Sequence, residues 1–155
     1  MAKQQIQNSN SRLLMSEILQ KVHNAKTKTE KVNLLRQYSS PTLKALIIWN
    51  YDESVSSALP EGEVPYKKND APMGTEHTRM ESESRKFYRF CKGGDPALKA
   101  SQREIMFIQL LEGLHESEAE VLCLVKDKKL TDKYRITFNV VQEAFPQITW
   151  GGRSK

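Results

Sequence analysis

The sequence has only two cysteines and no long apolar run. Cys91 and Cys123 could pair only with each other, so the chain carries no disulfide framework, and this usage is typical of a reducing compartment. No stretch approaches the roughly 18 consecutive apolar residues that a membrane-spanning helix requires. The polar N-terminus also lacks the apolar segment of a signal peptide. We therefore expect a cytoplasmic protein with no membrane partner.

Sequence motifs for catalysis and metal binding are also missing. The histidines His23, His77 and His115 are far apart, and neither cysteine has a second Cys or His at ligand spacing. There is neither a G-x-S-x-G nucleophile elbow nor a phosphate-binding G-x-x-x-x-G-K-S/T loop. The pair Gly93–Gly94 is more typical of a helix end than of a glycine-rich loop. We expect a protein that is not an enzyme, with no cofactor, no catalytic residues and no metal.

Apolar spacing and capping residues predict short helices in the N-terminal third. Thr27 and Glu30 have the spacing of a capping box. Ser40–Pro41 is a strong helix start, because proline at the first helical position loses no hydrogen bond. Before them, Ser11 can cap a first helix. Apolar residues then recur three or four apart on one face of that helix, at Leu14, Ile18, Val22 and Ala25.

The second half gives further helix signals. Apolar residues at helical spacing run from Met80 to Cys91 and end at the glycine pair. Ser101 with Glu104 and Ser117 with Glu120 are two more capping boxes. For the first of these two helices the expected buried stripe is Ile105, Ile108, Leu111 and Leu114, helped by Phe107 and Leu110.

The segment 134–145 is ambiguous. Its β-branched and aromatic residues could form a strand, whereas the four-residue spacing from Tyr134 to Phe138 favours a helix that Pro146 ends. We prefer the helix. The expected fold is therefore all-α, a compact multi-helix domain of about six to seven short helices.

Residues 52–78 break this pattern with three prolines and two glycines. A segment this long is either a functional loop or an ordered strap across the surface, and Leu59, Val64 and Tyr66 favour the strap. The expected organisation is a disordered N-terminus at 1–10, a single helical domain at 11–146 and a C-terminal tail at 147–155.

Charge is distributed unevenly along the chain, which has a net charge of +5. Residues 1–47 and 126–155 are rich in Lys and Arg, whereas 52–84 and 95–125 are rich in Asp and Glu. A fold that joins the two ends would form one positive face. A solvated surface with scattered charges is the alternative.

Two basic clusters occupy similar positions between helices, and a solvated surface would explain either one alone. Ammonium and guanidinium groups, together with the free N–H groups at helix starts, are the groups that bind phosphates. The candidate DNA-binding residues are Lys26, Lys28 and Lys31 in the first cluster and Lys128, Lys129, Lys133 and Arg135 in the second, which also includes Lys126.

Four segments resemble a conserved hypothetical protein family of T4-like tailed bacteriophages: Leu59–Gly62, Pro65–Lys67, Gly74–His77 and Phe107–Glu112. That resemblance spans nearly the whole chain. It implies a phage origin and, with it, the cytoplasm of the host cell.

The order of elements is also similar to the helical N-terminal DNA-binding domain of ATP-dependent DNA ligases. The matching pieces are Ile18–Trp49 and Lys126–Pro146. Where those ligases have glycine and small residues, this chain has Lys128 and Lys129. The Lys-x-Asp-Gly motif of the adenylated lysine is absent, so the resemblance implies a free-standing binding module that cannot seal nicks.

The leading hypothesis is a non-catalytic protein that binds duplex DNA through its phosphates. The alternatives are an adaptor or inhibitor acting on a host or phage complex, a virion assembly protein, and an enzyme of unfamiliar kind. For an adaptor, the contact would be the strap at 52–78 or an exposed tail at Trp150–Arg153.

Overall fold

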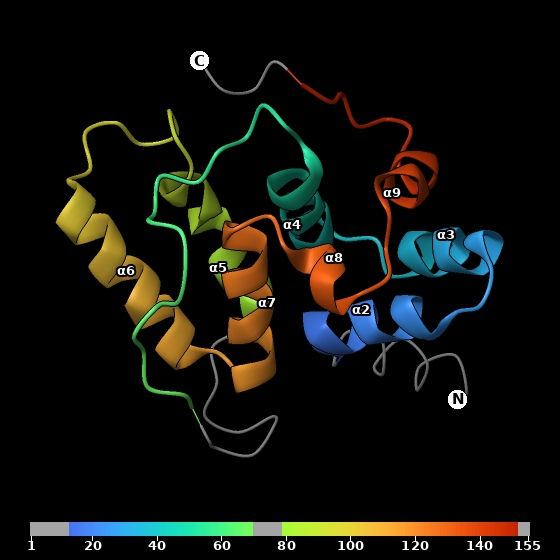
Figure 1. Ribbon diagram of the computed structural model, residues 1–155, viewed down its shortest axis with the longest axis horizontal. Coiled ribbons are helices and arrows are strands. Elements are labelled where there is room, and N and C mark those ends of the chain that lie inside the picture. Colours follow the sequence, from blue (N-terminus) through green and yellow to red (C-terminus); the bar gives the residue numbers. More distant parts are fainter. Residues whose placement is uncertain (1–12, 70–78, 152–155) are drawn as a thin grey trace.

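The computed structural model describes residues 13–69 and 79–151, and within them the fold is all-α (Figure 1). These ranges hold no β-strand, and their one isolated bridge pairs Ser57 with Cys91. The expected fold class is thereby confirmed. The elements are α2 (Met15–Asn24), α3 (Lys28–Gln37), α4 (Pro41–Tyr51), α5 (Met80–Glu83), the 3-10 helix η1 (Ser84–Phe90), α6 (Ala100–Gly113), α7 (Glu116–Lys126), α8 (Leu130–Lys133) and α9 (Phe138–Ala144).

Two of the predicted caps are correct. The Thr27 side chain accepts from Glu30 N at the start of α3, and Ser40 accepts from Leu43 N at the start of α4. The caps predicted for the next two long helices are wrong, because both helices begin before the predicted serine. Helix α6 follows Lys99, and in α7 the cap is His115, whose Nδ1 accepts from Ser117 N at 3.1 Å. Ser11 lies outside the described residues.

Helix α7 lies at the centre of the fold and packs against α2, α4 and α6, while α9 packs against α3 (Figure 1). The α7 residues Val121, Leu122 and Val125 are fully buried. The stripe predicted for α6 is correct except in its first part, where Ile105 is 50% exposed and Ile108 is half-buried. The buried stripe is Phe107, Leu110, Leu111 and Leu114, which follows helical spacing just as well.

The helix predicted from Met80 to Cys91 is instead a single α-turn followed by η1. At the end of η1 the backbone pairs with the strap and no longer with the helix. Ala58 N donates to Phe90 O at 2.8 Å, and Lys92 N donates to Ser56 O at 2.8 Å. Cys91 is consequently extended, and the chain turns at Gly93, whose φ is +83°.

The ambiguous segment is helical only in its second part. Helix α9 spans Phe138–Ala144, and the Thr137 hydroxyl accepts from Val140 N at 3.4 Å. The residues before it are not helical, and their large side chains, Tyr134 and Ile136, are buried in the core. Phe138 is 38% exposed, so the four-residue spacing from Tyr134 to Phe138 does not mark one buried helix face.

The described part of the strap, residues 52–69, crosses the surface without helix and packs onto it. Leu59 is buried, and Val64 and Tyr66 are half-buried against the core. Residues 70–78 of the strap lie outside the described range, as do residues 1–10, where we predicted disorder. None of the helices in the described ranges is both long and apolar enough to cross a bilayer.

The C-terminal residues fold back onto the domain as far as 151. The Trp150 ring meets Phe138 edge-on at 5.0 Å, and Gly151 N donates to the Asp52 carboxylate at 3.0 Å. Trp150 is half-buried, so our expectation of an exposed tail is wrong at this residue. The Trp150 side chain packs on Phe138, a partner that the spacing of the sequence does not indicate.

Candidate nucleic-acid interface

The first basic cluster lies on the turn between α2 and α3 and on the first turn of α3. The side chain of Lys26 is exposed. Lys28 forms an ion pair with Glu143 of α9 at 3.1 Å, and both side chains are 54% exposed. The ammonium of Lys31 donates to the backbone carbonyl of Arg135. The cluster therefore faces the segment that joins α8 to α9.

The structure brings the backbone of Arg135, in the second cluster, next to the first cluster. Arg135 N donates to His23 Nδ1 at 2.9 Å, and the rings of His23 and Tyr134 meet edge-on at 6.4 Å. These contacts fix the backbone of 134–135 against α2. The Arg135 side chain is exposed, and Lys133 pairs with Glu120 of α7.

Lys128 has a structural role that does not fit our prediction of a phosphate contact. Its ammonium donates to Trp49 O at 2.7 Å and to Asp52 O at 2.8 Å, which caps the C-terminal end of α4. Burial lowers the pKa of this ammonium. Sequence reasoning could not find these partners, because they lie more than 70 residues earlier in the chain.

The backbone of Lys128 has a conformation that is unusual for a residue with a side chain. Its φ is +58°, the left-handed conformation that favours glycine. Lys128 N donates to Val125 O at 3.0 Å and Lys129 N to Leu124 O at 2.8 Å, which are the two bonds of a Schellman motif. Lysine stands where glycine is usual, and its two side-chain hydrogen bonds offset the backbone strain.

Lys129 belongs to the strap side of the molecule. Its ammonium lies 4.0 Å from the Glu61 carboxylate, and both side chains are more than half exposed. Lys128 and Lys129 are therefore turned toward α4 and the strap. Five of the seven predicted DNA-binding residues lie on the α2–α3 turn, on α3, or at the end of α8 and just after it, and we call these the basic face: Lys26, Lys28, Lys31, Lys133 and Arg135.

Sequence reasoning missed the group that anchors the strap. The Lys126 side chain is fully buried, and its ammonium donates to Pro60 O at 2.7 Å and Gly62 O at 3.1 Å. It also pairs with Asp127 Oδ1 at 2.6 Å. The signal was present, because Lys126 follows Ala119 and Leu122 on the buried face of α7 at helical spacing.

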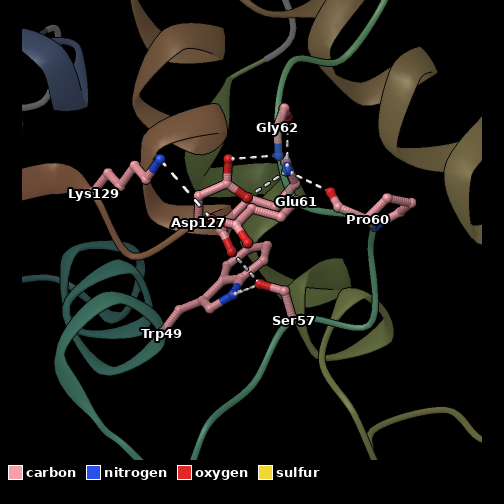
Figure 2. A network of polar contacts seen from close by, with 8 residues as sticks. Trp49, Ser57, Pro60, Glu61, Gly62, Asp127 and Lys129 are labelled. Atoms are coloured by element: carbon pink, nitrogen blue, oxygen red, sulfur yellow. Dashed lines mark hydrogen bonds and ion pairs between the residues drawn. The ribbon is translucent and has the colours of Figure 1, made fainter.

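The same anchor includes a bridge to the core. Figure 2 shows the Trp49 indole donating to Ser57 Oγ, at 2.9 Å, and Asp127 accepting from Gly62 N, at 3.1 Å. The Ser57 hydroxyl in turn donates to Lys126 O. The strap is thus fixed to α4 and α7 by charged and polar groups that the fold shields from water.

Within residues 13–69 and 79–151, no group of three or more His, Cys, Asp or Glu residues is arranged to hold a metal ion. Cys91 and Cys123 are free and half-buried. Burial raises the pKa of each thiol to about 11, which makes both weak nucleophiles at neutral pH.

Comparison with known protein families assigns most of the chain to one of them. Residues 18–132 match the profile of a family of unknown function, DUF6433. The chain belongs to this family. The DUF6433 match extends from α2 to α8, so it includes the first basic cluster and the strap but ends before Arg135 and α9. No curated protein and no solved structure matches the chain.

Proposed function

We propose that this DUF6433 protein is a non-catalytic protein that binds the phosphate backbone of duplex DNA through the basic face. The observation that carries the proposal is the contact between Lys31 and the Arg135 carbonyl. This contact brings Arg135 next to the first basic cluster, about a hundred residues earlier in the sequence, and so supports a shared phosphate-binding surface. Both clusters lie beside helix ends, where side chains and N–H groups reach phosphates.

The charges of this face are available to a ligand. The carboxylates of Glu143 and Glu120 pair with Lys28 and Lys133 through side chains that are about half exposed. Exposed pairs of this kind contribute about 0–1 kcal/mol, so phosphates can replace those carboxylates. Lys31 donates to a carbonyl, which leaves its positive charge uncompensated.

The expected DNA binding has little sequence preference. Lysine and arginine side chains that contact phosphates position a duplex but do not read the edges of its bases. The resemblance to the ligase DNA-binding domain, seen in the sequence, supports a duplex as the target. Because the adenylated-lysine motif is absent from the sequence, the bound protein would not seal a nick. A phage origin remains part of this proposal.

Charge reversal at two exposed positions tests the proposal. Lys26 and Arg135 have no side-chain hydrogen bond or ion pair to other described residues, so Lys26→Glu with Arg135→Glu should leave the fold intact. We expect this double variant to weaken binding to every duplex by roughly tenfold or more in about 50 mM salt. Fluorescence anisotropy with labelled intact, nicked and single-stranded oligonucleotides measures the affinities.

The matched control is Lys67→Glu with Lys68→Glu, which makes the same change of charge on the exposed strap. If the basic face binds DNA, this control should weaken binding much less than the Lys26/Arg135 pair. Equal weakening by both double variants would show that only net charge matters. A wild-type protein that binds no duplex in low salt would instead favour a protein partner.

A further inference from the structure

A cleft of about 360 Å³ opens between α4, η1, the start of the strap and the turn at 91–94. It shares no residue with the basic face. Its volume is at the lower end of the range for sites that bind small molecules, about 300–1,000 Å³. Six of its lining residues matter for its chemistry: Ile48, Trp49, Arg85, Phe87, Tyr88 and Lys92.

The floor of this cleft is formed by two aromatic side chains that are almost fully buried, Trp49 at 2% exposed and Phe87 at 4%. Trp49 stacks on Phe90 with 13° between the ring planes and lies 5.8 Å from Phe87, centroid to centroid. The hydrogen bond from its indole to Ser57 fixes the ring further. Ile48 and Val55 complete the apolar lining. The buried rings make the floor rigid, and the apolar side chains that a ligand can reach are Ile48, Val55 and Tyr88, so little freedom is lost when a ring binds.

Tyr88 forms one wall of the cleft and is 50% exposed, which is unusual for a large aromatic side chain. Arg89 holds it from behind, with its guanidinium 5.6 Å from the ring centre and its Nε donating to Tyr88 Oη at 3.1 Å. Arg89 is itself 3.8 Å from the Asp95 carboxylate. The tyrosine is therefore positioned, although its face is open to solvent.

The rim of the cleft is positively charged. Arg85 and Lys92 are exposed, and no Asp or Glu is among the lining residues. The hydroxyls of Ser54 and Ser84 are turned away, because they donate to Asp52 Oδ1 and Glu81 O. Since the Cys91 thiol keeps a pKa of about 11 through burial, it stays neutral and does not repel an anion.

Two glycines bring Lys92 to this rim. Gly94 N donates to Cys91 O at 3.1 Å, which closes a tight turn. A Cβ at position 94 would lie only 1.9 Å from Tyr88 O, so any other residue would push the turn away from η1. The glycine pair thus has a local role in shaping the cleft, beyond ending a helix.

We propose that this cleft binds a nucleoside 5′-monophosphate group, either free or at the end of a nucleic-acid strand. The base would lie against the ring of Tyr88 and the apolar side chains of Ile48 and Val55, and the phosphate would pair with Arg85 and Lys92. An uncharged aromatic compound would leave the two cations unused. Inorganic phosphate would leave the apolar surface exposed to water.

Calorimetric titration of the full-length protein tests this proposal with three probes: adenosine 5′-monophosphate, adenosine and inorganic phosphate. The monophosphate should bind at least about tenfold more tightly than either of the others, because only it uses both parts of the cleft. No heat of binding with the monophosphate up to millimolar concentration would overturn the proposal. So would equal affinity for inorganic phosphate.

Variants locate the binding in the cleft. Arg85→Gln with Lys92→Gln should weaken monophosphate binding by about tenfold or more, since each good charged contact contributes over 1 kcal/mol. The matched control, Lys86→Gln with Lys99→Gln, removes the same charge from exposed positions outside the cleft. Equal loss in both double variants would contradict the proposed site.

A second variant blocks the cleft without removing charge. Ala45 is half-buried, lines the cleft on α4, and lies within a helix that tolerates leucine. Ala45→Leu should abolish binding of the monophosphate while the circular-dichroism spectrum stays unchanged. Binding that survives in this folded variant would also overturn the proposal.

The source of the monophosphate is distinguished with oligonucleotides. If the site takes strand ends, a 5′-phosphorylated trinucleotide should bind as tightly as the free monophosphate and the unphosphorylated one about tenfold less. If it takes the free compound, both trinucleotides should bind weakly. Either result supports the site. The Lys26→Glu/Arg135→Glu variant should bind the monophosphate normally, because it leaves the cleft intact.

Discussion

Replacing Lys126 with methionine should lower the free energy of unfolding by about 3–5 kcal/mol, the usual cost of removing one partner from a buried charged pair. The substitution leaves Asp127 without its cation and the carbonyls of Pro60 and Gly62 without their donor. Urea denaturation measures the change. A typical domain is stable by only about 5–15 kcal/mol, so this is a large fraction.

The control for this result is Lys99→Met, at an exposed position, which should change stability by less than about 0.5 kcal/mol. Limited trypsin digestion gives a second readout. The wild-type strap should resist cleavage at Lys67 and Lys68, whereas the Lys126 variant should be cut there early. A Lys126→Met protein with unchanged stability would show that the strap is held by its apolar contacts alone.

Stability should fall as the pH rises from about 4.5 to about 7, because of Glu118. Burial raises the pKa of this carboxyl from 4.5 to about 7, with a smaller contribution from the nearby Glu81 and Glu17. Its Oε2 accepts from Met15 N at 2.7 Å, whereas Oε1 is buried with no hydrogen-bond partner among the described residues. Arg79 and the Met15 hydrogen bond act in the opposite direction.

The sign follows from proton binding. Between pH 4.5 and 7 the folded protein keeps the Glu118 proton while the unfolded chain has lost it, so each rise in pH favours unfolding. The stabilisation is complete below pH 4.5 and lost above about pH 7. A difference of this size corresponds to about 3 kcal/mol.

Glu118→Gln isolates this contribution, because glutamine keeps an acceptor for Met15 N but cannot ionise. Urea denaturation between pH 5 and 8 should show a much flatter dependence for this variant than for the wild type. Glu116→Gln, at the exposed start of the same helix, is the control and should keep the wild-type slope. A wild-type protein whose stability does not fall over this range would contradict the assignment.

Local signals in the sequence were sufficient for the starts of α3 and α4 but not for the segment from Met80 to Cys91, where contacts with the strap decide the backbone. The caps at Thr27 and Ser40 act over three residues, so they could be predicted without knowledge of the fold. The errors at Ser101 and Ser117 occurred where the helix began one or two residues earlier. In α7 this happened because His115 supplied the acceptor, a residue that is not among the usual caps.

Long-range partners explain why the site was only partly predictable. The sequence indicated two basic clusters but not which lysines would be used inside the fold. The burial of Lys126 could have been predicted from its helical spacing on α7. The carbonyls that Lys126 and Lys128 bind lie more than 60 residues away along the chain, so no spacing rule identifies these partners. The bend at 134–137, which turns Arg135 toward α3, likewise depends on the burial of Tyr134 and Ile136.

The salt dependence of duplex affinity tests the central claim most directly. Each phosphate contact releases counterions, so log affinity should fall linearly with log salt concentration, by about 0.9 for each phosphate engaged. With three to five of the basic-face cations engaged, we predict a slope between about −3 and −4.5 over roughly 50–200 mM salt. The Lys26→Glu/Arg135→Glu variant should lose about 2 units of that slope, and the Lys67→Glu/Lys68→Glu control should keep it. A slope near zero, or one that the basic-face variant leaves unchanged, would contradict the account.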